Sequence, residues 1–509
     1  MSEGEQKKVK VAEEEEVDLI SNLPDVLLGS IIYLLPYMEV VRTSVLSKRW
    51  ETLWKNAHDL SFDQRQMLKS LIEDYIQNSP LVDRLTMAME RKVAPINEEY
   101  FDVIAEAALM ITSNIDNHIG PLKSCTIRHL PESCASADVV GWLRKLLEKG
   151  VIKVSIERES CDYHNGGISD MDVKLAASTI DLPFEVFSNF KVLELKNYYF
   201  NTTPSPDSQQ TLKTLTLNKV RIISNTFYDI LAYCSSLENL TVENCDFLRD
   251  ELKIVSPSLK YIKICKMNVL RILISAFNVE VIEIDSIICS HQDLVFEAPK
   301  LQVLRAYNEF QMLGEIVFID GRKLLTTRDI IEICSGILGH RGSGMGNIFK
   351  HLVTLCLDFE LNSSRNTRAL SFALKSYPQL MNLQINNQVK FDYYDQNDND
   401  SLPYPVSLFW LKRDPCRCVS RNLKSVCIKG YKGGEFEFEF VKYLVLNGGV
   451  MDNITIWFLD ECSWDEVVAT ACLRSYPKLS PKLSIDLKPG TEYIQKYGGS
   501  FDEWVRTLN

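Results

Sequence analysis

The spacing of apolar residues predicts a first helix close to the N-terminus, within a helical region of about residues 19 to 63. Pro24 and Asp25 suit the first turn of this helix, because proline lacks only an N–H that would be unpaired there. An acid at the next position favours the positive end of the helix dipole. Pro36 is expected to end the helix.

Two further short helices are predicted from the same pattern. A second helix from Met38 towards Leu46 would place Val41 and Val45 on one face at i, i+4. Ser47 can cap a third helix, in which apolar residues recur at i, i+3 and i+4. These residues are Trp50, Leu53 and Trp54. A unit this small, with no disulfide or metal to hold it, is expected to be only marginally stable.

The apolar residues of this three-helix unit outnumber those that such short helices can bury among themselves. An apolar patch left exposed usually marks a surface for a partner, and burying one large aliphatic side chain contributes about 1.5–3 kcal/mol. The alternative is a private core with neighbouring helices, and the pattern alone does not separate the two. The candidates for a partner surface are Leu23, Pro24, Ile31, Leu34, Val41, Val45, Leu46 and Trp50.

After this unit, from about residue 64 to 190, helical and strand patterns mix. Residues 139–157 show an amphipathic helix, then Gly150 as a C-terminal stop, then a short alternating strand. Helix, glycine and strand in direct succession form a repeat-like unit.

From Phe190 onwards an L-x-x-L-x-L pattern recurs, and it is the strongest internal signal in the chain. The first six copies lie 22, 25, 22, 20 and 22 residues apart, and three more follow a longer insertion. Their middle apolar residues are Leu193, Leu215, Leu240, Ile262, Ile282, Leu304, Leu355, Leu383 and Val426. Periods in the low twenties with this pattern are typical of leucine-rich repeats, in which one short strand per repeat stacks into a curved solenoid. The uneven periods predict an irregular arc.

Residues next to the inward-pointing leucines of such strands face the concave surface of the solenoid. Their charges are of both signs, which suits a protein or peptide partner better than nucleic acid. The alternative is a solvated face without a ligand. The main substrate-binding candidates are Glu194, Thr216, Thr241, Lys263, Glu283, Arg305 and Tyr307. Further candidates on the same face are Lys196, Asn218, Glu243, Asp285, Asp358, Gln384 and Asn386.

Composition narrows the function classes. The chain has 509 residues, 46% of them hydrophobic, and a net charge of -12, which argues against a nucleic-acid binder. No apolar run is long enough for a membrane helix, and the charged N-terminus does not resemble a signal peptide. The cysteines are scattered singly, which favours reduced, buried thiols in a cytoplasmic or nuclear protein. No catalytic motif accompanies the seven histidines.

Three segments raise weaker alternatives. Cys416 and Cys418 form the only close cysteine pair, but no histidine lies near them, so a metal site is disfavoured. Residues 339–347 are glycine-rich but lack the spacing of a phosphate-binding loop. Residues 391–405 are acidic but lack the glycine and terminal glutamate of an EF-hand. No cofactor is expected.

Two segments of the sequence resemble known domains. Residues 23–54, "LPDVLLGSIIYLLPYMEVVRTSVLSKRWETLW", resemble an F-box, and "SVLSKRW" is similar to plant F-box proteins. Residues 418–458 resemble an FBD domain, with a strand, a turn bearing glycines, an acidic amphipathic helix and another strand. With the repeats between them, the chain resembles plant F-box/FBD/LRR-repeat proteins.

This resemblance implies an α/β multidomain chain: a three-helix F-box, then an irregular leucine-rich-repeat solenoid ending in an FBD domain. The expected segments are a disordered acidic leader (1–17), F-box (18–64), solenoid with insertions (65–410), FBD domain (411–490) and tail (491–509).

The resemblance also implies a function. F-boxes dock onto a Skp-family adaptor and through it onto a cullin, so the chain would be the non-catalytic substrate-recognition subunit of a Skp–cullin–F-box ubiquitin ligase. It would raise the effective concentration of a protein substrate near ubiquitin. The alternative is an interaction scaffold that binds the adaptor or other partners without promoting ubiquitylation.

Overall fold

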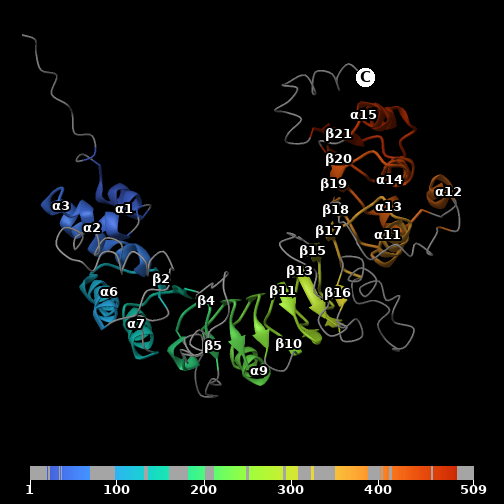
Figure 1. Ribbon diagram of the computed structural model, residues 1–509. Coiled ribbons are helices and arrows are strands. Elements are labelled where there is room, and N and C mark those ends of the chain that lie inside the picture. Colours follow the sequence, from blue (N-terminus) through green and yellow to red (C-terminus); the bar gives the residue numbers. More distant parts are fainter. Residues whose placement is uncertain are drawn as a thin grey trace, which may run out of the picture. The chain divides into compact units, whose positions relative to one another are not determined.

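The computed structural model separates the chain into two compact units, Met1–Val151 and Ile152–Asn509 (Figure 1). The residues it describes are 20, 23–33, 35, 37–68, 98–130, 136–159, 182–187, 189–200, 211–247, 251–289, 294–307, 323–325, 350–387, 402, 405–411, 415–459 and 462–489. The predicted leader and tail, the glycine-rich segment 339–347 and most of the acidic segment 391–405 lie outside the described residues.

The first unit contains the three predicted short helices and the beginning of the repeats. Its elements are α1 (Asp25–Tyr33), α2 (Tyr37–Thr43), α3 (Lys48–Leu53), η1 (Trp54–Asn56), β1 (Asp59–Asp63), α6 (Glu98–Asn117), β2 (Ser124–His129) and α7 (Ser136–Glu148). Strand β1 pairs in parallel with β2. This pairing joins the three-helix segment to the first repeats, so the compact unit extends well beyond residue 64.

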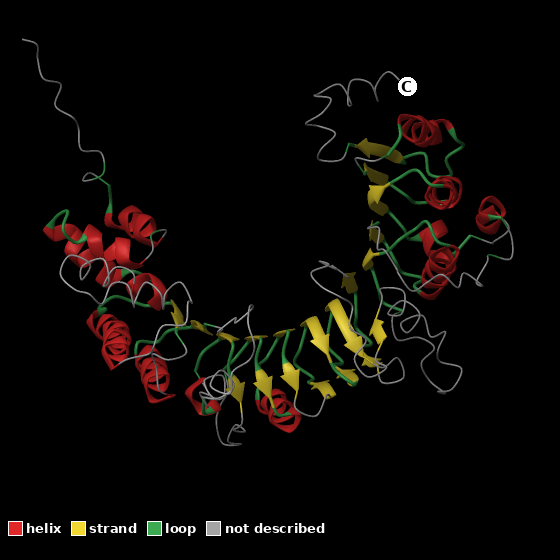
Figure 2. Cartoon of the chain, in the orientation of Figure 1, coloured by secondary structure: helices red, strands yellow, loops and turns green. Residues whose placement is uncertain are grey.

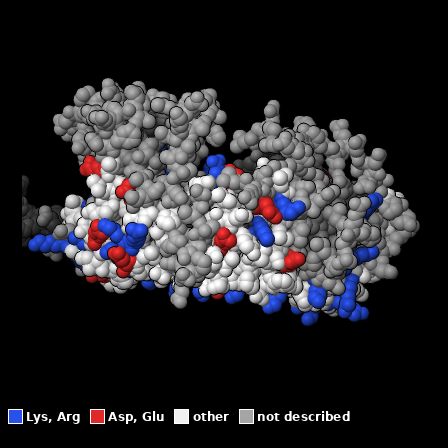
Figure 3. All heavy atoms as spheres, turned by 90° about the horizontal axis from the view of Figure 1, so that it is seen from below, with Lys and Arg blue, Asp and Glu red and all other residues white. Residues whose placement is uncertain are grey.

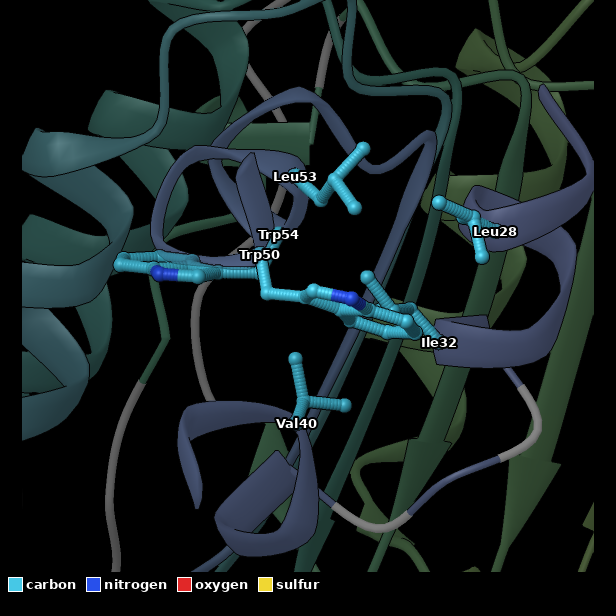
Figure 4. Packing of buried hydrophobic residues seen from close by; sticks show 6 residues of the cluster. All are labelled: Leu28, Ile32, Val40, Trp50, Leu53 and Trp54. Carbon is cyan, nitrogen blue, oxygen red and sulfur yellow. The ribbon is translucent and has the colours of Figure 1, made fainter. Parts of the chain in front are cut away.

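The three short helices share one apolar core, shown in Figure 4. Its buried members are Leu28, Ile32, Val40, Trp50, Leu53 and Trp54, with Leu23 and Leu35 packed against them. The prediction of three helices is therefore confirmed, but the second helix ends at Thr43 and not near Leu46. Val45 lies in the turn after it.

A buried histidine ties the end of α6 to the segment after the three helices. The Nε2–H of His118 donates to the carbonyl oxygen of Ala57 over 2.8 Å, and its Nδ1 has no hydrogen-bond partner among the described residues. Burial lowers the pKa of His118, and the positive charge of Lys149 lowers it further. The neutral imidazole is therefore the form that fits this site.

The second unit is built on a curved parallel sheet with helices on its outer side (Figure 2). The strands of this sheet are β3 (Lys153–Arg158), β4 (Val192–Lys196), β6 (Thr214–Asn218), β8 (Asn239–Glu243), β11 (Tyr261–Asn268), β13 (Val281–Cys289), β15 (Val303–Tyr307), β17 (Thr354–Asp358), β18 (Asn382–Asn386), β19 (Ser425–Tyr431), β20 (Asn453–Phe458) and β21 (Ser484–Lys488). Strand β16 (Lys323–Leu325) pairs antiparallel with β13.

The register of this sheet confirms the repeat pattern at every predicted position. Leu193 pairs with Leu215 and Leu215 with Leu240, and the same column continues through Leu355 and Leu383. All nine middle residues are buried, since each strand places them on the face that the connecting helices and short strands cover. They therefore form one continuous apolar column, as expected for stacked repeats.

Helices and short strands connect the strands of the main sheet. The helices are η2 (Phe184–Phe187), α9 (Ser224–Tyr233), α11 (Ser364–Ser376), α12 (Val406–Leu411), α13 (Arg417–Arg421), α14 (Glu435–Asn447), α15 (Trp464–Ala471) and η5 (Cys472–Ser475). Two small sheets add β5 (Tyr199–Phe200), β7 (Arg221–Ile222) and β9 (Asp246–Phe247), and β10 (Glu251–Val255), β12 (Arg271–Ser275) and β14 (Leu294–Glu297).

One backbone feature recurs in five successive repeats. A residue with positive φ directly follows the strand in β4, β6 and β8, and it lies at the sixth position within the longer strands β11 and β13. These residues are Asn197, Lys219, Asn244, Lys266 and Ser286. Residues other than glycine rarely adopt this conformation, and asparagine does so more readily than most. At Lys219, Lys266 and Ser286 the turn therefore goes against local preference and is imposed by the stacking of the repeats.

The predicted helix–glycine–strand and FBD patterns are both confirmed. Helix α7 is followed by Gly150 at φ +73° and then by β3. In the FBD region, β19 contains Gly430 at φ +74° and is followed by Gly433 at φ +83°, then by α14 and β20. A Cβ on Gly430 would lie 2.3 Å from the carbonyl oxygen of Asn387, so no side chain fits there.

The FBD region continues the sheet of the repeats without a break. Strand β19 pairs in register with β18, and Val426 stands opposite Leu383. The buried carboxylate of Glu437 on α14 accepts hydrogen bonds from the backbone N–H groups of Lys432 and Gly434, both over 3.0 Å, and from the side-chain amide of Asn387. This cluster joins the residue after β18 to the first turn of α14.

Candidate functional site

Helix α1 exposes a second apolar face opposite the one in the core. Leu28 and Ile32 point into the core, whereas Val26 is 80% exposed, Leu27 is half exposed and Ile31 is 38% exposed. Leu27 and Ile31 stand at i, i+4, so they are neighbours on the helix surface. The short helix is therefore apolar on both sides, and only one side is covered within the chain.

The turn after α2 adds two more exposed apolar side chains. Val45 is 86% exposed and Leu46 is 66% exposed. Both side chains are held on a turn whose backbone N–H groups bond to Arg42 and Thr43. We call Val26, Leu27, Ile31, Val45 and Leu46 the exposed F-box set.

An arginine on α3 fixes the entry to α1. The Arg49 guanidinium donates to the carboxylate of Asp25, with its Nε at 2.8 Å, and to the carbonyl oxygen of Leu23 at 2.5 Å. These bonds join α3 to the first turn of α1, which helps to hold the helix in place while its outer face stays uncovered.

The structure divides the predicted partner-surface residues into groups. Ile31, Val45, Leu46 and Pro24 are exposed, and Leu23 is half-buried against the core. Leu34 and the side chain of Val41 lie outside the described residues.

The prediction that Trp50 faces a partner is wrong for the chain as folded here. Trp50 is only 6% exposed and belongs to the private core. It shares one helix stripe with Leu53 and Trp54, and this stripe is turned inward. Sequence reasoning also missed Val26 and Leu27; the signal was an α1 with apolar residues at too many positions for a single buried stripe.

The predicted substrate-binding residues do lie on one face of the main sheet. Glu194, Thr216 and Thr241 stand side by side in neighbouring strands, and Lys263, Glu283 and Arg305 continue the same column. Each is half-buried. Tyr307 ends β15 on this face, two residues after Arg305. We call this surface the inner face. Whether a substrate binds there stays a prediction.

Not every residue predicted for the inner face is available on it. Asp358 is buried, because the Asn386 side chain donates to its carboxylate over 2.7 Å from the next strand. Gln384 in turn donates to the amide oxygen of Asn386 over 3.1 Å. These three residues satisfy one another within the sheet.

Most charges in the middle of the inner face are paired across strands. Glu194 pairs with Lys153 at 2.8 Å, and Glu283 pairs with Arg305 and, at 3.8 Å, with Lys263. Burial raises the pKa of the Tyr261 hydroxyl, and its hydrogen bond to Glu283 raises it further. This part of the face is therefore close to neutral and internally satisfied.

The described residues hold no group of histidine, cysteine and acidic side chains that could bind a metal ion. Ten of the cysteines among them are free thiols, and most of these are buried. Cys418 donates to the carbonyl oxygen of Leu374 over 2.8 Å, and burial raises the pKa of its thiol to about 12. Such thiols are core residues and poor nucleophiles.

Outside the inner face, charges of both signs are interspersed. In the view of Figure 3, lysine and arginine side chains and aspartate and glutamate side chains lie scattered among uncharged residues. No helix in the described part of the chain has both the length and the apolar content that crossing a membrane requires.

Comparisons with known proteins identify the domains. The family model for the F-box domain matches residues 20–61, and the model for FBD matches residues 412–456. The model for the LRR repeats of FBD-associated F-box protein At5g56370 matches residues 139–324. The F-box match coincides with the three helices that carry the exposed F-box set.

The relatives match over most of their length. F-box protein At1g80960 of Arabidopsis thaliana is 26% identical over 455 residues, covering 86% of this chain and 84% of the relative. F-box/FBD/LRR-repeat protein At3g14710 of the same plant is 23% identical over 496 residues, covering 94% of this chain and 96% of the relative.

The three domains in this order define an F-box protein with a leucine-rich-repeat region in the middle and an FBD near the C-terminus. Its relatives include F-box/FBD/LRR-repeat proteins of Arabidopsis thaliana, to which the chain is similar over most of its length.

Proposed function

We propose that this chain is the substrate-recognition subunit of a Skp–cullin–F-box ubiquitin ligase. The observation that carries the proposal is the exposed F-box set: five apolar side chains on a unit that already has its own core. Covering such a surface requires another polypeptide, and an F-box domain in general binds a Skp-family adaptor. The adaptor would in turn bring a cullin.

In this proposal the repeats and the FBD region hold a protein substrate on the inner face. The chain performs no chemistry itself; it keeps the substrate close to ubiquitin carried by another subunit, which raises the effective concentration of the reacting groups. Among the described residues, Cys418 is buried and its pKa is raised, so its thiol is a poor nucleophile. The carboxylate of Glu194 is paired with Lys153. The protein would act in the cytoplasm, the nucleus or both.

Proximity labelling with the proteasome blocked tests the proposal, comparing the intact chain with a chain lacking residues 19–63. We expect the intact chain to label the adaptor, a cullin and a set of ubiquitylated proteins. The shortened chain should keep the substrates and lose the adaptor and the cullin. If the intact chain labelled the adaptor but never a cullin, the protein would be a scaffold and the ligase proposal would fail.

A further inference from the structure

The last three strands of the second unit are β19, β20 and β21 (Figure 1). They carry a basic and aromatic row on the inner face. Lys429 of β19 stands opposite Trp457 of β20, and Trp457 stands opposite Lys488 of β21. Both lysines are exposed and the tryptophan is half-buried. The ammonium of Lys488 lies 4.7 Å from the centre of the Trp457 ring, within the range of a cation–π interaction. We call these three residues the basic row.

The basic row differs from the rest of the inner face in its charge. Lys153, Lys196 and Lys263 each pair with a glutamate on a neighbouring strand. Neither Lys429 nor Lys488, in contrast, forms an ion pair with any residue that the structure describes. Two unpaired ammonium groups on one face are conspicuous in a chain with a net charge of -12.

Two of the three residues that precede the row on the same face are uncharged. Thr455 and Cys427 lie two residues before Trp457 and Lys429 on the same face, and both are half-buried. Burial raises the pKa of the Cys427 thiol, so this side chain adds no negative charge at neutral pH. Asp486 is the acidic neighbour, two residues before Lys488 on β21, and it is exposed.

We propose that the basic row binds an acidic peptide segment of a protein partner, which makes it the part of the inner face that recognises a substrate. This inference extends the proposed function. It depends on that function only in calling the bound partner a substrate. Neighbouring strands lie about 4.8 Å apart, so the two lysines are about 10 Å apart at their backbones. In an extended peptide, acidic residues two or four positions apart are about 7 or 13 Å apart and point to the same side. With the spacing of four, the residue midway between the acids points to the same side, and an apolar side chain there would cover the Trp457 ring.

The test measures direct binding of a fluorescent peptide to the full chain. The probe is a ten-residue peptide with two glutamates four positions apart and a leucine midway between them, and the control peptide carries glutamine in place of glutamate. We expect K429E/K488E to weaken binding by about tenfold or more, and W457A to weaken it as well. Because surface charges are screened, raising the salt to ~0.5 M should also weaken binding to the native chain.

A matched control variant distinguishes loss of the site from the effects of a changed net charge or of misfolding. Lys253 stacks over Tyr228 at 4.6 Å on the small sheet, and Lys300 donates to Asn278 near another turn. K253E/K300E makes the same change in net charge as K429E/K488E, and it should bind the probe like the native chain. Equal thermal unfolding midpoints would show that both variants fold.

Three results would overturn the inference. One is a failure of charge dependence: the native chain binds the acidic and glutamine peptides equally well, or K429E/K488E binds the acidic peptide as well as the native chain does. Another is tighter binding of a ten-nucleotide oligouridylate at the same row, since the site would then take nucleic acid. The third is binding of the probe only after residues 1–17 are removed, because the glutamates at 13–16 would then be the occupant. None of these outcomes depends on the adaptor, so failure here and failure of the ligase proposal are distinguishable.

Discussion

Replacing Trp50 with alanine is expected to loosen the three-helix segment from within. Trp50 is 6% exposed and packs with Leu53, Trp54 and the core face of α1. Truncating a buried aromatic side chain to alanine costs about 3–5 kcal/mol. The F-box helices form a small unit with few apolar residues to spare, so this loss is a large share of their stability.

Hydrogen exchange on the full chain measures this loss locally, because a chain of two units need not unfold in one step. A loss of about 3 kcal/mol raises the exchange rates of protected amides in α1 and α3 by roughly a hundredfold or more. The amides of β11 and β13 in the second unit should keep their rates.

Val45→Ala is the matched variant for Trp50→Ala, since Val45 is 86% exposed and leaves no cavity when shortened. Its exchange rates should equal those of the native chain. The reasoning is refuted if Trp50→Ala leaves the amides of α1 and α3 as slow as before, or if Val45→Ala raises them equally.

Three further predictions concern groups whose surroundings the structure defines. Glu437→Ala leaves the N–H groups of Lys432 and Gly434 without their acceptor, so we expect a loss of about 3 kcal/mol or more, seen as faster exchange in α14. The pKa of His118 is held below its ordinary value of 6.5 by burial; the unfolded chain therefore binds the proton more readily, and the stability of the first unit should be full above pH 6.5 and fall as the pH drops through the lowered pKa. His118→Gln, which can still donate to Ala57 but cannot be charged, should flatten that dependence in pH-dependent unfolding. Lys219 has φ +51° and is exposed, so Lys219→Gly should stabilise the second unit by about 0.5 kcal/mol and Lys219→Val should destabilise it by more than about 1 kcal/mol, an order that denaturant titration would check.

The sequence was most informative where one physical constraint repeats. Each repeat must turn its apolar edge towards its neighbours, so the L-x-x-L-x-L pattern predicts both the strands and their register, as the column through Leu215 and Leu383 confirms. Continuation of that column through Val426 into the FBD region follows from the same rule. The positive φ at Lys219 could not be predicted, because stacking imposes it on a residue with no preference for it.

The F-box helices were harder to interpret, because periodicity says which residues share a face but not which face is buried. Trp50 and Ile31 both belong to apolar stripes, and only the packing of the three helices turns one inward and leaves the other 38% exposed. The end of α2 at Thr43 was also missed, since the apolar spacing continues through Val45 in the turn. Burial of Asp358 depends on Asn386 of another repeat, a pairing that the local pattern does not contain.

The central claim is that the exposed F-box set is covered by a Skp-family adaptor. The most direct measurement is the equilibrium affinity of a purified adaptor for the full chain, compared between the native protein and L27D/I31D, with Leu479→Asp, an exposed position of the second unit, as the control. Placing two carboxylates where apolar burial should occur is expected to weaken binding at least a hundredfold, about 3 kcal/mol, and the control should leave it unchanged. Equal affinity of L27D/I31D and the native chain for the adaptor would contradict the account.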